Sequence, residues 1–182
     1  MFQQVKNDII SEIKGTLDYV DSNSIDQFIE LIEKSNRVFF VGVGRVLLSL
    51  QAIAKRWNHL GIQTCIVGDI TEPAITSRDI LIVGSGSGRT AFPLIIAEKA
   101  KKYGATVVHI GTTDDCPMSN ISDYFICIPA SNKLEQGITS IQPMTSLFEQ
   151  SLLLFGDTLS LIYIRKHHLN MQSLWQFHAN LE

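Results

Sequence analysis

The stretch DILIVGSGSGRTAFPLIIAEKA, residues 79–100, runs from a short apolar segment through a loop of glycines and hydroxyls into a helical pattern. An apolar run of this length bounded by glycine is typical of a strand that is buried on both faces, and such strands occur mainly in parallel sheets. The helical pattern behind the loop indicates a crossover connection. The stretch therefore predicts one strand-loop-helix unit of an α/β protein.

Four other short runs have the same apolar character and are rich in β-branched or aromatic residues. They cover residues 37–43, 64–68, 106–111 and 123–128. Helical patterns lie between several of the runs, at 48–60 and 90–104. This alternation predicts a doubly wound, mostly parallel five-stranded sheet of flavodoxin-like type, with helices on both faces. We expect a single domain over residues 1–182, since this length matches about one domain.

Both ends of the chain add helical patterns. The first two cover residues 5–17 and 24–35, and we expect Ser24 to cap the second, with Gln27 completing a capping box. Residues 143–168 form a longer pattern that is apolar on most of its circumference. A helix of this kind is buried either in the core or against another subunit. We favour a subunit interface, because exposed apolar patches of that size are rare on monomers.

Composition and charge exclude several classes of function. The net charge is −3 and the basic residues are dispersed, so we expect no nucleic-acid partner. The N-terminus mixes acids into a helical period and lacks the order of a secretion signal, which indicates a cytoplasmic protein. The long apolar pattern is interrupted by Glu149, Gly156 and Asp157, so we expect no membrane span.

The cysteines are expected to be structural thiols. Cys65, Cys116 and Cys127 are scattered without the spacing of metal ligands. Cys65 and Cys127 lie in apolar runs that predict buried strands. No metal and no other cofactor is expected.

The loop after the run at 79–84 has the composition of an anion site. Gly86 and Gly88 allow the backbone to approach a ligand closely, and Ser85, Ser87 and Thr90 offer hydroxyl donors. A helix that begins near Thr90 adds free N–H groups and a positive dipole end. The lysine of a P-loop is missing, and the loop does not follow the first strand, where a dinucleotide motif belongs. We predict phosphate binding; the alternative is a loop that only caps the helix.

With this loop, the chain resembles sugar isomerase (SIS) domains, which bind phosphosugars. Further segments resemble the 6-phospho-3-hexuloisomerase family in particular, and together they span nearly the whole chain. These segments are RWNHLGIQTCIVGD, EPAI, IVGSGSGRT, IQPMTSLFEQ and the terminal HANLE. The resemblance implies a small-molecule phosphosugar substrate, a homotetramer and a role in the ribulose monophosphate pathway of formaldehyde fixation.

The resemblance also implies a reaction. An isomerase of this family moves the carbonyl of a 3-hexulose 6-phosphate to the second carbon through an enediol, which yields fructose 6-phosphate. A proton must leave one carbon and return to its neighbour, which requires a carboxylate or imidazole within hydrogen-bond reach of both. Glu149 matches the glutamate of the family's LFE segment and opens an apolar helix, so it is the leading base. Its alternative role is to complement the helix dipole.

Two histidines and the end of the first strand complete the candidate site. His59 is placed to protonate an oxygen or open the sugar ring, and His178 to reach the site of a neighbouring subunit. Gly44 and Arg45 are candidates for substrate binding, although a solvated surface role fits Arg45 equally well. His109 lies inside a strand pattern and is expected to be structural.

Other functions stay open because the chain departs from the family at several positions. The family has Ser-Gly where this chain has Val46-Leu47, and Glu where it has Arg89. A non-catalytic phosphosugar sensor would keep the loop and not need Glu149. An aldose–ketose isomerase for another sugar phosphate is the remaining alternative.

Overall fold

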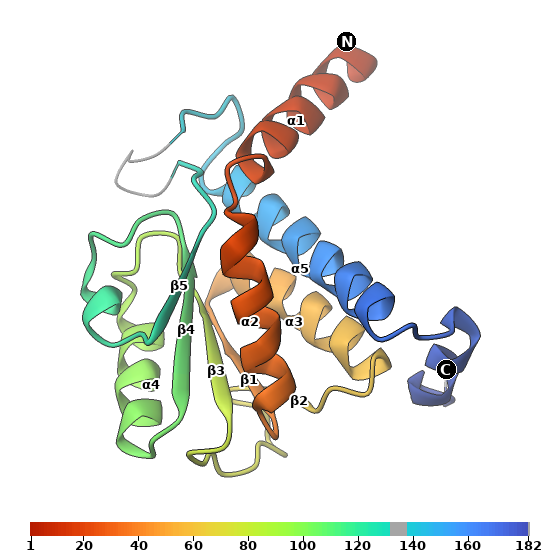
Figure 1. Cartoon of the computed structure of the whole chain (residues 1–182). Helices are drawn as coiled ribbons and strands as arrows, with labels where there is room; N and C mark the ends of the chain where they lie inside the picture. The colour runs from red at the N-terminus through yellow and green to blue at the C-terminus, as the bar shows by residue number, and fades with distance from the viewer. Residues whose placement is uncertain (132–137, 182) are drawn as a thin grey trace.

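The computed structural model describes residues 1–131 and 138–181 and contains a five-stranded sheet between layers of helices (Figure 1). The strands are β1 (Val38–Val41), β2 (Thr64–Ile66), β3 (Ile80–Gly84), β4 (Thr106–Gly111) and β5 (Tyr124–Cys127). The α-helices are α1 (Phe2–Leu17), α2 (Ser22–Lys34), α3 (Gly44–His59), α4 (Ala91–Lys102) and α5 (Ser146–Lys166). Two short 3-10 helices are η1 (Pro117–Asn120) and η2 (Met171–Phe177).

The sheet has the predicted topology. Its order is β2-β1-β3-β4-β5, and every neighbouring pair is parallel. From β1 the chain crosses to β2 on one side, whereas from β3 it crosses to β4 on the other. The loops after β1 and β3 therefore diverge, and this switch point is where α/β sheets bind ligands.

The two faces of the sheet bury separate apolar layers. Helices α2, α3 and α5 cover one face, where Phe40 packs edge-on against Trp57 with 5.5 Å between ring centroids (Figure 1). The other face packs against α4 and η1 through residues such as Val83, Ala97 and Met118. The central strands β1 and β3 are buried along their whole length, which explains their uninterrupted apolar sequences.

Helix α5 divides its apolar residues between the core and the surface. Leu147, Leu152 and Leu159 are buried inside the chain's own core. The prediction that this helix is buried against another subunit was therefore wrong for these residues. Leu154 and Leu161 lie on the outer side and are nearly half exposed. By length and composition alone α5 could cross a membrane, but half of its apolar window is buried in the protein.

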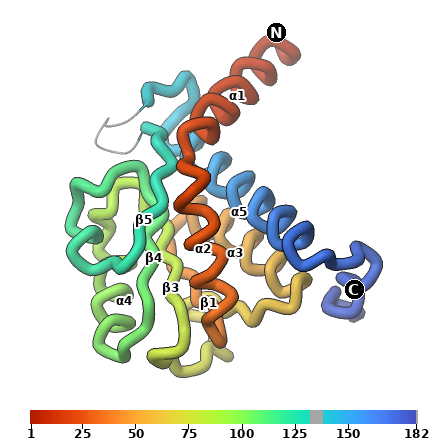
Figure 2. Tube along the Cα trace, in the orientation of Figure 1, coloured from red at the N-terminus to blue at the C-terminus, as the bar shows by residue number. Residues whose placement is uncertain are grey.

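Helix α1 extends away from the rest of the molecule (Figures 1 and 2). Only Thr16 of this helix is buried, while Phe2, Val5 and Ile10 are exposed. Its apolar spacing is that of an amphipathic helix. Ile13 and Leu17 pack against the core, whereas the exposed apolar residues nearer the N-terminus have no such cover within the described chain.

Two local predictions were wrong. The cap of α2 is Asp21, whose carboxylate accepts the N–H of Asn23, and Ser24 lies inside the helix. Gln27 accepts a hydrogen bond from the Tyr124 hydroxyl instead of closing a capping box. The sequence offered several capping residues in a row, and the upstream one begins the helix.

Cys127 is exposed, contrary to the expectation of a buried strand. It ends β5, which is an edge strand, and Cys65 on the opposite edge strand β2 is only half buried. Apolar sequence alone does not distinguish an edge strand from a central one. Cys116, outside the strands, is the buried cysteine.

Candidate functional site

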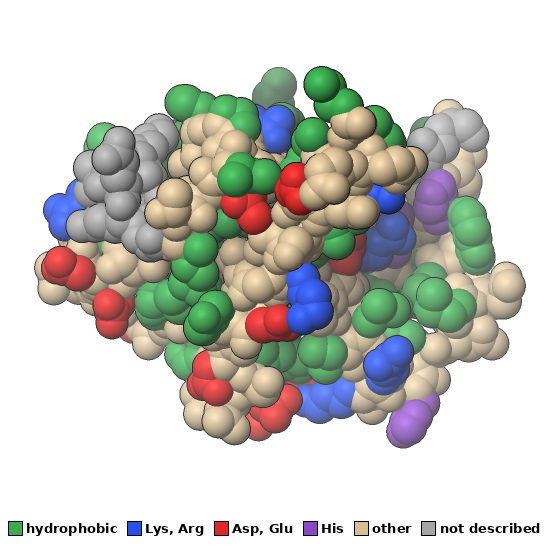
Figure 3. All heavy atoms as spheres, turned by 90° about the horizontal axis from the view of Figure 1, so that it is seen from above, with side chains coloured by type: hydrophobic (Ala, Val, Ile, Leu, Met, Phe, Trp, Pro, Cys, Tyr) green, Lys and Arg blue, Asp and Glu red, His purple; other side chains and the backbone are tan. Residues whose placement is uncertain are grey.

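The predicted phosphate loop, residues 85–90 between β3 and α4, opens into a cavity of about 270 Å³ at the switch point of the sheet. The lining comes from the loops after β1 and β3 and from the beginning of α5. The residues are Val43, Gly44, Arg45, Val46, Gly84, Ser85, Gly86, Ser87, Thr90, Met144, Thr145, Phe148 and Glu149. The structure thus brings residues of the phosphate loop, Gly44, Arg45 and Glu149 to one place. Seen from above, the molecule shows acidic and basic side chains next to each other among apolar ones (Figure 3).

Three helix N-termini meet at this cavity. The N-cap residues Val43 of α3, Thr90 of α4 and Thr145 of α5 all line it, and none makes a side-chain capping hydrogen bond. Each helix therefore offers uncapped N–H groups and the positive end of its dipole. An anion in the cavity would be stabilised by all three helices. From the sequence, only the helix beginning near Thr90 was expected to offer its N-terminus to an anion, because the convergence of the three helices is a property of the tertiary fold.

The phosphate loop is held in place by β4. Ser85 donates its N–H to the Ile110 carbonyl at 3.0 Å, and the Gly86 carbonyl accepts from the backbone and hydroxyl of Thr112, each at 2.9 Å. Gly88 has φ +59°, a left-handed conformation that favours glycine. Among the described residues nothing hydrogen-bonds to the buried Ser85 hydroxyl, so this hydroxyl is available to donate to a ligand.

Glu149 faces the same cavity from the first turn of α5 and is only 7% exposed. One carboxylate oxygen accepts the Thr145 hydroxyl at 2.7 Å, and the other accepts Nε of Arg45. Ser49 of α3 donates to the Glu149 backbone carbonyl at 2.9 Å, which ties the two helices together. Neither Thr145 nor Ser49 was identified from the sequence, although the four-residue spacing of Thr145 and Glu149 is that of neighbours on a helix.

Arg45, the partner of the Glu149 carboxylate, extends into solvent. Its side chain is 63% exposed although its partner Glu149 is buried. Gly44 beside it has φ +58°, and a Cβ there would meet nothing within 4 Å, so the requirement for glycine is conformational. Arg89, in contrast, turns its guanidinium to the Asp115 carbonyl at 3.1 Å.

The two candidate histidines lie together but away from Glu149 within one chain. His59 and His178 stack with 5.0 Å between ring centroids, and Trp175 lies 5.0 Å from His178. His59 ends α3, whereas Gly44 at the cavity begins it. Fifteen residues of helix separate the two ends, or about 22 Å. The structure therefore does not bring these histidines to the cavity of their own chain.

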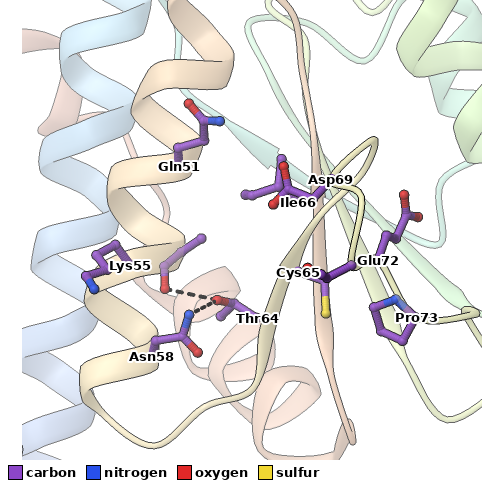
Figure 4. Close-up of a pocket in the computed structure, with 11 residues that line it drawn as sticks. Gln51, Lys55, Asn58, Thr64, Cys65, Ile66, Asp69, Glu72 and Pro73 are labelled. Atoms are coloured by element: carbon purple, nitrogen blue, oxygen red, sulfur yellow. Dashed lines mark hydrogen bonds between the residues drawn. The ribbon is translucent and has the colours of Figure 1, made fainter. Parts of the chain in front are cut away.

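Another cavity, also of about 270 Å³, lies between α3 and the edge strand β2 (Figure 4). Three of its polar side chains have partners within the chain: Asn58 donates to the Thr64 hydroxyl at 2.7 Å, and Glu72 accepts the Gly68 N–H at 2.7 Å. Unlike the cavity at the switch point, this cavity is not lined by the N-termini of three helices. Across residues 1–131 and 138–181, no cluster of three His, Cys, Asp or Glu side chains could hold a metal ion.

Comparisons with known proteins converge on one family. A family model described as SIS domain matches residues 31–154. A protein of Bacillus subtilis (strain 168) named 3-hexulose-6-phosphate isomerase is 34% identical over 177 residues, covering 96% of both chains. One of the same name from Mycobacterium gastri is 36% identical over 172 residues, covering 94% of this chain and 86% of the relative.

A solved structure is also similar to this chain over almost its whole length. A crystal structure of a Methanococcus jannaschii protein, from which the function of a 3-hexulose-6-phosphate isomerase was inferred, superposes with a TM-score of 0.85. The two proteins are 28% identical, and the match covers 98% of this chain and 99% of the other.

Proposed function

Because the chain belongs to the sugar isomerase (SIS) domain family and is a phosphosugar isomerase, we propose that it converts 3-hexulose 6-phosphate to fructose 6-phosphate. This activity would serve the ribulose monophosphate pathway. The observation that carries the proposal is a buried carboxylate, Glu149, that faces the same cavity as the phosphate loop.

The phosphate group would bind at the loop after β3. The hydroxyls of Ser85, Ser87 and Thr90 and the N–H groups around Gly86 and Gly88 would donate to its oxygens. The three helix N-termini would favour the negative charge electrostatically. The phosphate would thereby hold the rest of the sugar beside α5.

Glu149 would act as the base. It would take the proton from the second carbon of the sugar while the oxygen on the third carbon becomes protonated, giving an enediol. The hydroxyl on the second carbon then loses its proton, the third carbon receives one, and the carbonyl is left on the second carbon. One carboxylate can serve both steps because the carbons are adjacent. The hydroxyl of Thr145, which donates to the carboxylate, would keep its orientation fixed.

Arg45 would change partners when the substrate binds. In the free protein it pairs with Glu149, and its exposed side chain has room to move. A sugar phosphate in the cavity offers anionic and hydroxyl oxygens that compete for the guanidinium. Their competition would free one oxygen of Glu149 for the proton transfer.

The histidines would act between subunits of a cytoplasmic homotetramer. Exposed apolar residues on α1 and the outer side of α5 supply surface for such contacts. His59 and His178 lie at the end of α3 remote from their own cavity, so they would complete the cavity of a neighbour. Light scattering should give four times the 20.3 kDa chain mass, and a monomer at micromolar concentration would contradict the assembly.

A panel of phosphorylated ketoses and aldoses, assayed with the purified protein, tests the activity. We expect conversion of 3-hexulose 6-phosphate, with deuterium from D₂O entering the exchanging carbon. Turnover of an aldose phosphate in place of the hexulose phosphate would establish the aldose–ketose alternative. Binding of sugar phosphates without turnover of any would establish the sensor.

A further inference from the structure

His109 of β4 is a buried imidazole for which the proposed reaction has no use. Its side chain is 0% exposed and lies against the phosphate loop, with Phe125 of β5 5.1 Å away on the neighbouring strand. Its Nε2 lies 2.8 Å from the carbonyl oxygen of Ser85, the first residue of that loop. The ring is therefore in direct contact with the backbone that would bind phosphate.

The geometry fixes which nitrogen carries the proton. A carbonyl oxygen only accepts hydrogen bonds, so Nε2 must be the protonated nitrogen and the donor. Among the described residues Nδ1 has no partner, so a second proton there would be buried without an acceptor. Burial also lowers the pKa of His109, although the hydrogen bond to Ser85 opposes this effect. At neutral pH the ring is thus a fixed, uncharged donor.

The surrounding backbone fits closely around the ring. A Cβ on Gly111 would lie 2.4 Å from Nε2, and a Cβ on Gly88 would lie 3.2 Å from Cε1. Two glycines thus provide the space that the imidazole fills. Ser85 is bound to β4 through both of its backbone polar groups, by its N–H to Ile110 and by its carbonyl to His109.

We infer that His109 is a positioning residue, which holds the Ser85 peptide so that the loop's donors converge on the phosphate. The inference rests on the proposed phosphate site, but it assigns the imidazole no contact with the sugar. Its loss should therefore weaken phosphate binding and leave the proton transfer at Glu149 unchanged. In kinetic terms this is a loss of binding that is uniform between ground state and transition state.

A matched pair of variants tests the inference. His109→Met keeps an unbranched side chain of comparable bulk but removes the donor, whereas His109→Gln places an amide N–H where Nε2 stood. We expect His109→Met to raise the KM for the sugar phosphate and the Kd for inorganic phosphate about fivefold to tenfold, the range for one hydrogen bond, with kcat within about twofold. His109→Gln should restore both constants to within about twofold of the parent.

The opposite results are equally clear. If both variants melt at lower temperature but keep the parent's KM and phosphate affinity, His109 is only structural and the inference is wrong. A wild-type ¹⁵N spectrum provides a second measurement that needs no folded Met variant. The His109 signal, assigned by its absence from His109→Gln, should report the Nε2–H tautomer; the Nδ1–H tautomer would overturn the inference.

The test also separates this inference from the proposed function. If the parent binds inorganic phosphate but isomerises no sugar, the activity is wrong, and the phosphate titration still decides the role of His109. If the parent binds no phosphate, the phosphate site and the positioning role are both wrong, even if isomerisation occurs.

Discussion

Two buried carboxylates, Asp79 and Glu149, each pair with an arginine, and they lie at opposite ends of the sheet. Asp79 precedes β3, and its side chain is 0% exposed. It accepts from Nε and Nη2 of Arg37, each at 3.2 Å, and from the N–H and hydroxyl of Thr76, each at 2.7 Å. Burial alone would raise the pKa of Asp79, but the hydrogen bonds from Thr76 and Arg37 outweigh it, so the pKa is lowered.

Glu149 differs in what surrounds it. A cavity lies in front of it, and its partner Arg45 is 63% exposed, compared with 25% for Arg37. The donors around Asp79 come from buried or partly buried groups, whereas Arg45 is exposed enough for the exchange of partners that we propose. Burial and an arginine partner therefore do not by themselves identify a catalytic acid or base. The adjoining cavity and the exposed partner distinguish Glu149 from Asp79.

Replacing Glu149 by Gln should produce the largest effect on activity. The amide keeps the shape and some hydrogen bonding but removes the basicity, so kcat should fall at least ~10²-fold. The affinity for the sugar phosphate should change little, because the phosphate loop is untouched. Steady-state kinetics and calorimetry measure the two quantities. Near-normal turnover would transfer the role of base to His59 or His178.

Removing both loop serines should weaken the binding of sugar phosphate. Ser85→Ala combined with Ser87→Ala should cost about 2–3 kcal/mol of binding free energy, at roughly 1–1.5 kcal/mol per hydrogen bond to a charged group. Calorimetry measures the change, and Ser11→Ala, on the exposed side of α1, is the control. Unchanged affinity in the folded double variant would refute phosphate binding by these hydroxyls.

Asp79→Asn should have the opposite effect to the one expected of Glu149→Gln: a loss of stability without a loss of turnover. The substitution removes the charge opposite Arg37. It also places an amide NH₂ group among the hydrogen-bond donors of Arg37 and Thr76, where the carboxylate only accepts. In urea, the free energy of unfolding should fall by about 2 kcal/mol. This loss is smaller than for a fully buried ion pair because Arg37 is partly exposed. The folded variant should keep its kcat. A variant of normal stability would mean that the network at Asp79 is not structural.

The smallest effect is expected in the pH dependence of the free energy of unfolding. The pKa of Asp79 is lower in the folded protein than the ordinary value of about 3.9, so the unfolded chain binds its proton first. The stability from this group is present above about pH 3.9 and is lost as pH falls through the folded pKa. Chemical unfolding from pH 6 downward should show a shallower decline in Asp79→Asn. A decline of equal steepness in both proteins would contradict this assignment.

The sequence predicted the sheet better than its surroundings. The strand at 106–111 has the predicted bounds, and all five predicted strands are present, because buried parallel strands have a strong local pattern. The loop and Glu149 were also placed correctly at the beginnings of helices. The exposure of Cys127 was not predictable, since the order of strands decides which of them form the edges.

The contacts of the site depended on the tertiary fold. Arg45 and Glu149 are 104 positions apart in the chain, and no local pattern joins them. The stacking of His59 on His178 and the convergence of three helix termini have the same origin. The chemistry of each residue could be read from the sequence, but the set of residues that lie together could not.

The position of α5 as the last long helix also determines when the site forms during synthesis. The phosphate loop and the strands β1 and β3 are made early, but Glu149 follows Gly84 by about 65 residues. At roughly 5–20 residues per second, a ribosome needs about 3–13 s to supply that segment. During this interval the nascent chain can carry the loop proposed to bind phosphate without the carboxylate, and the apolar surface that α5 covers remains open. The last third of the chain therefore completes both the core and the lining of the cavity.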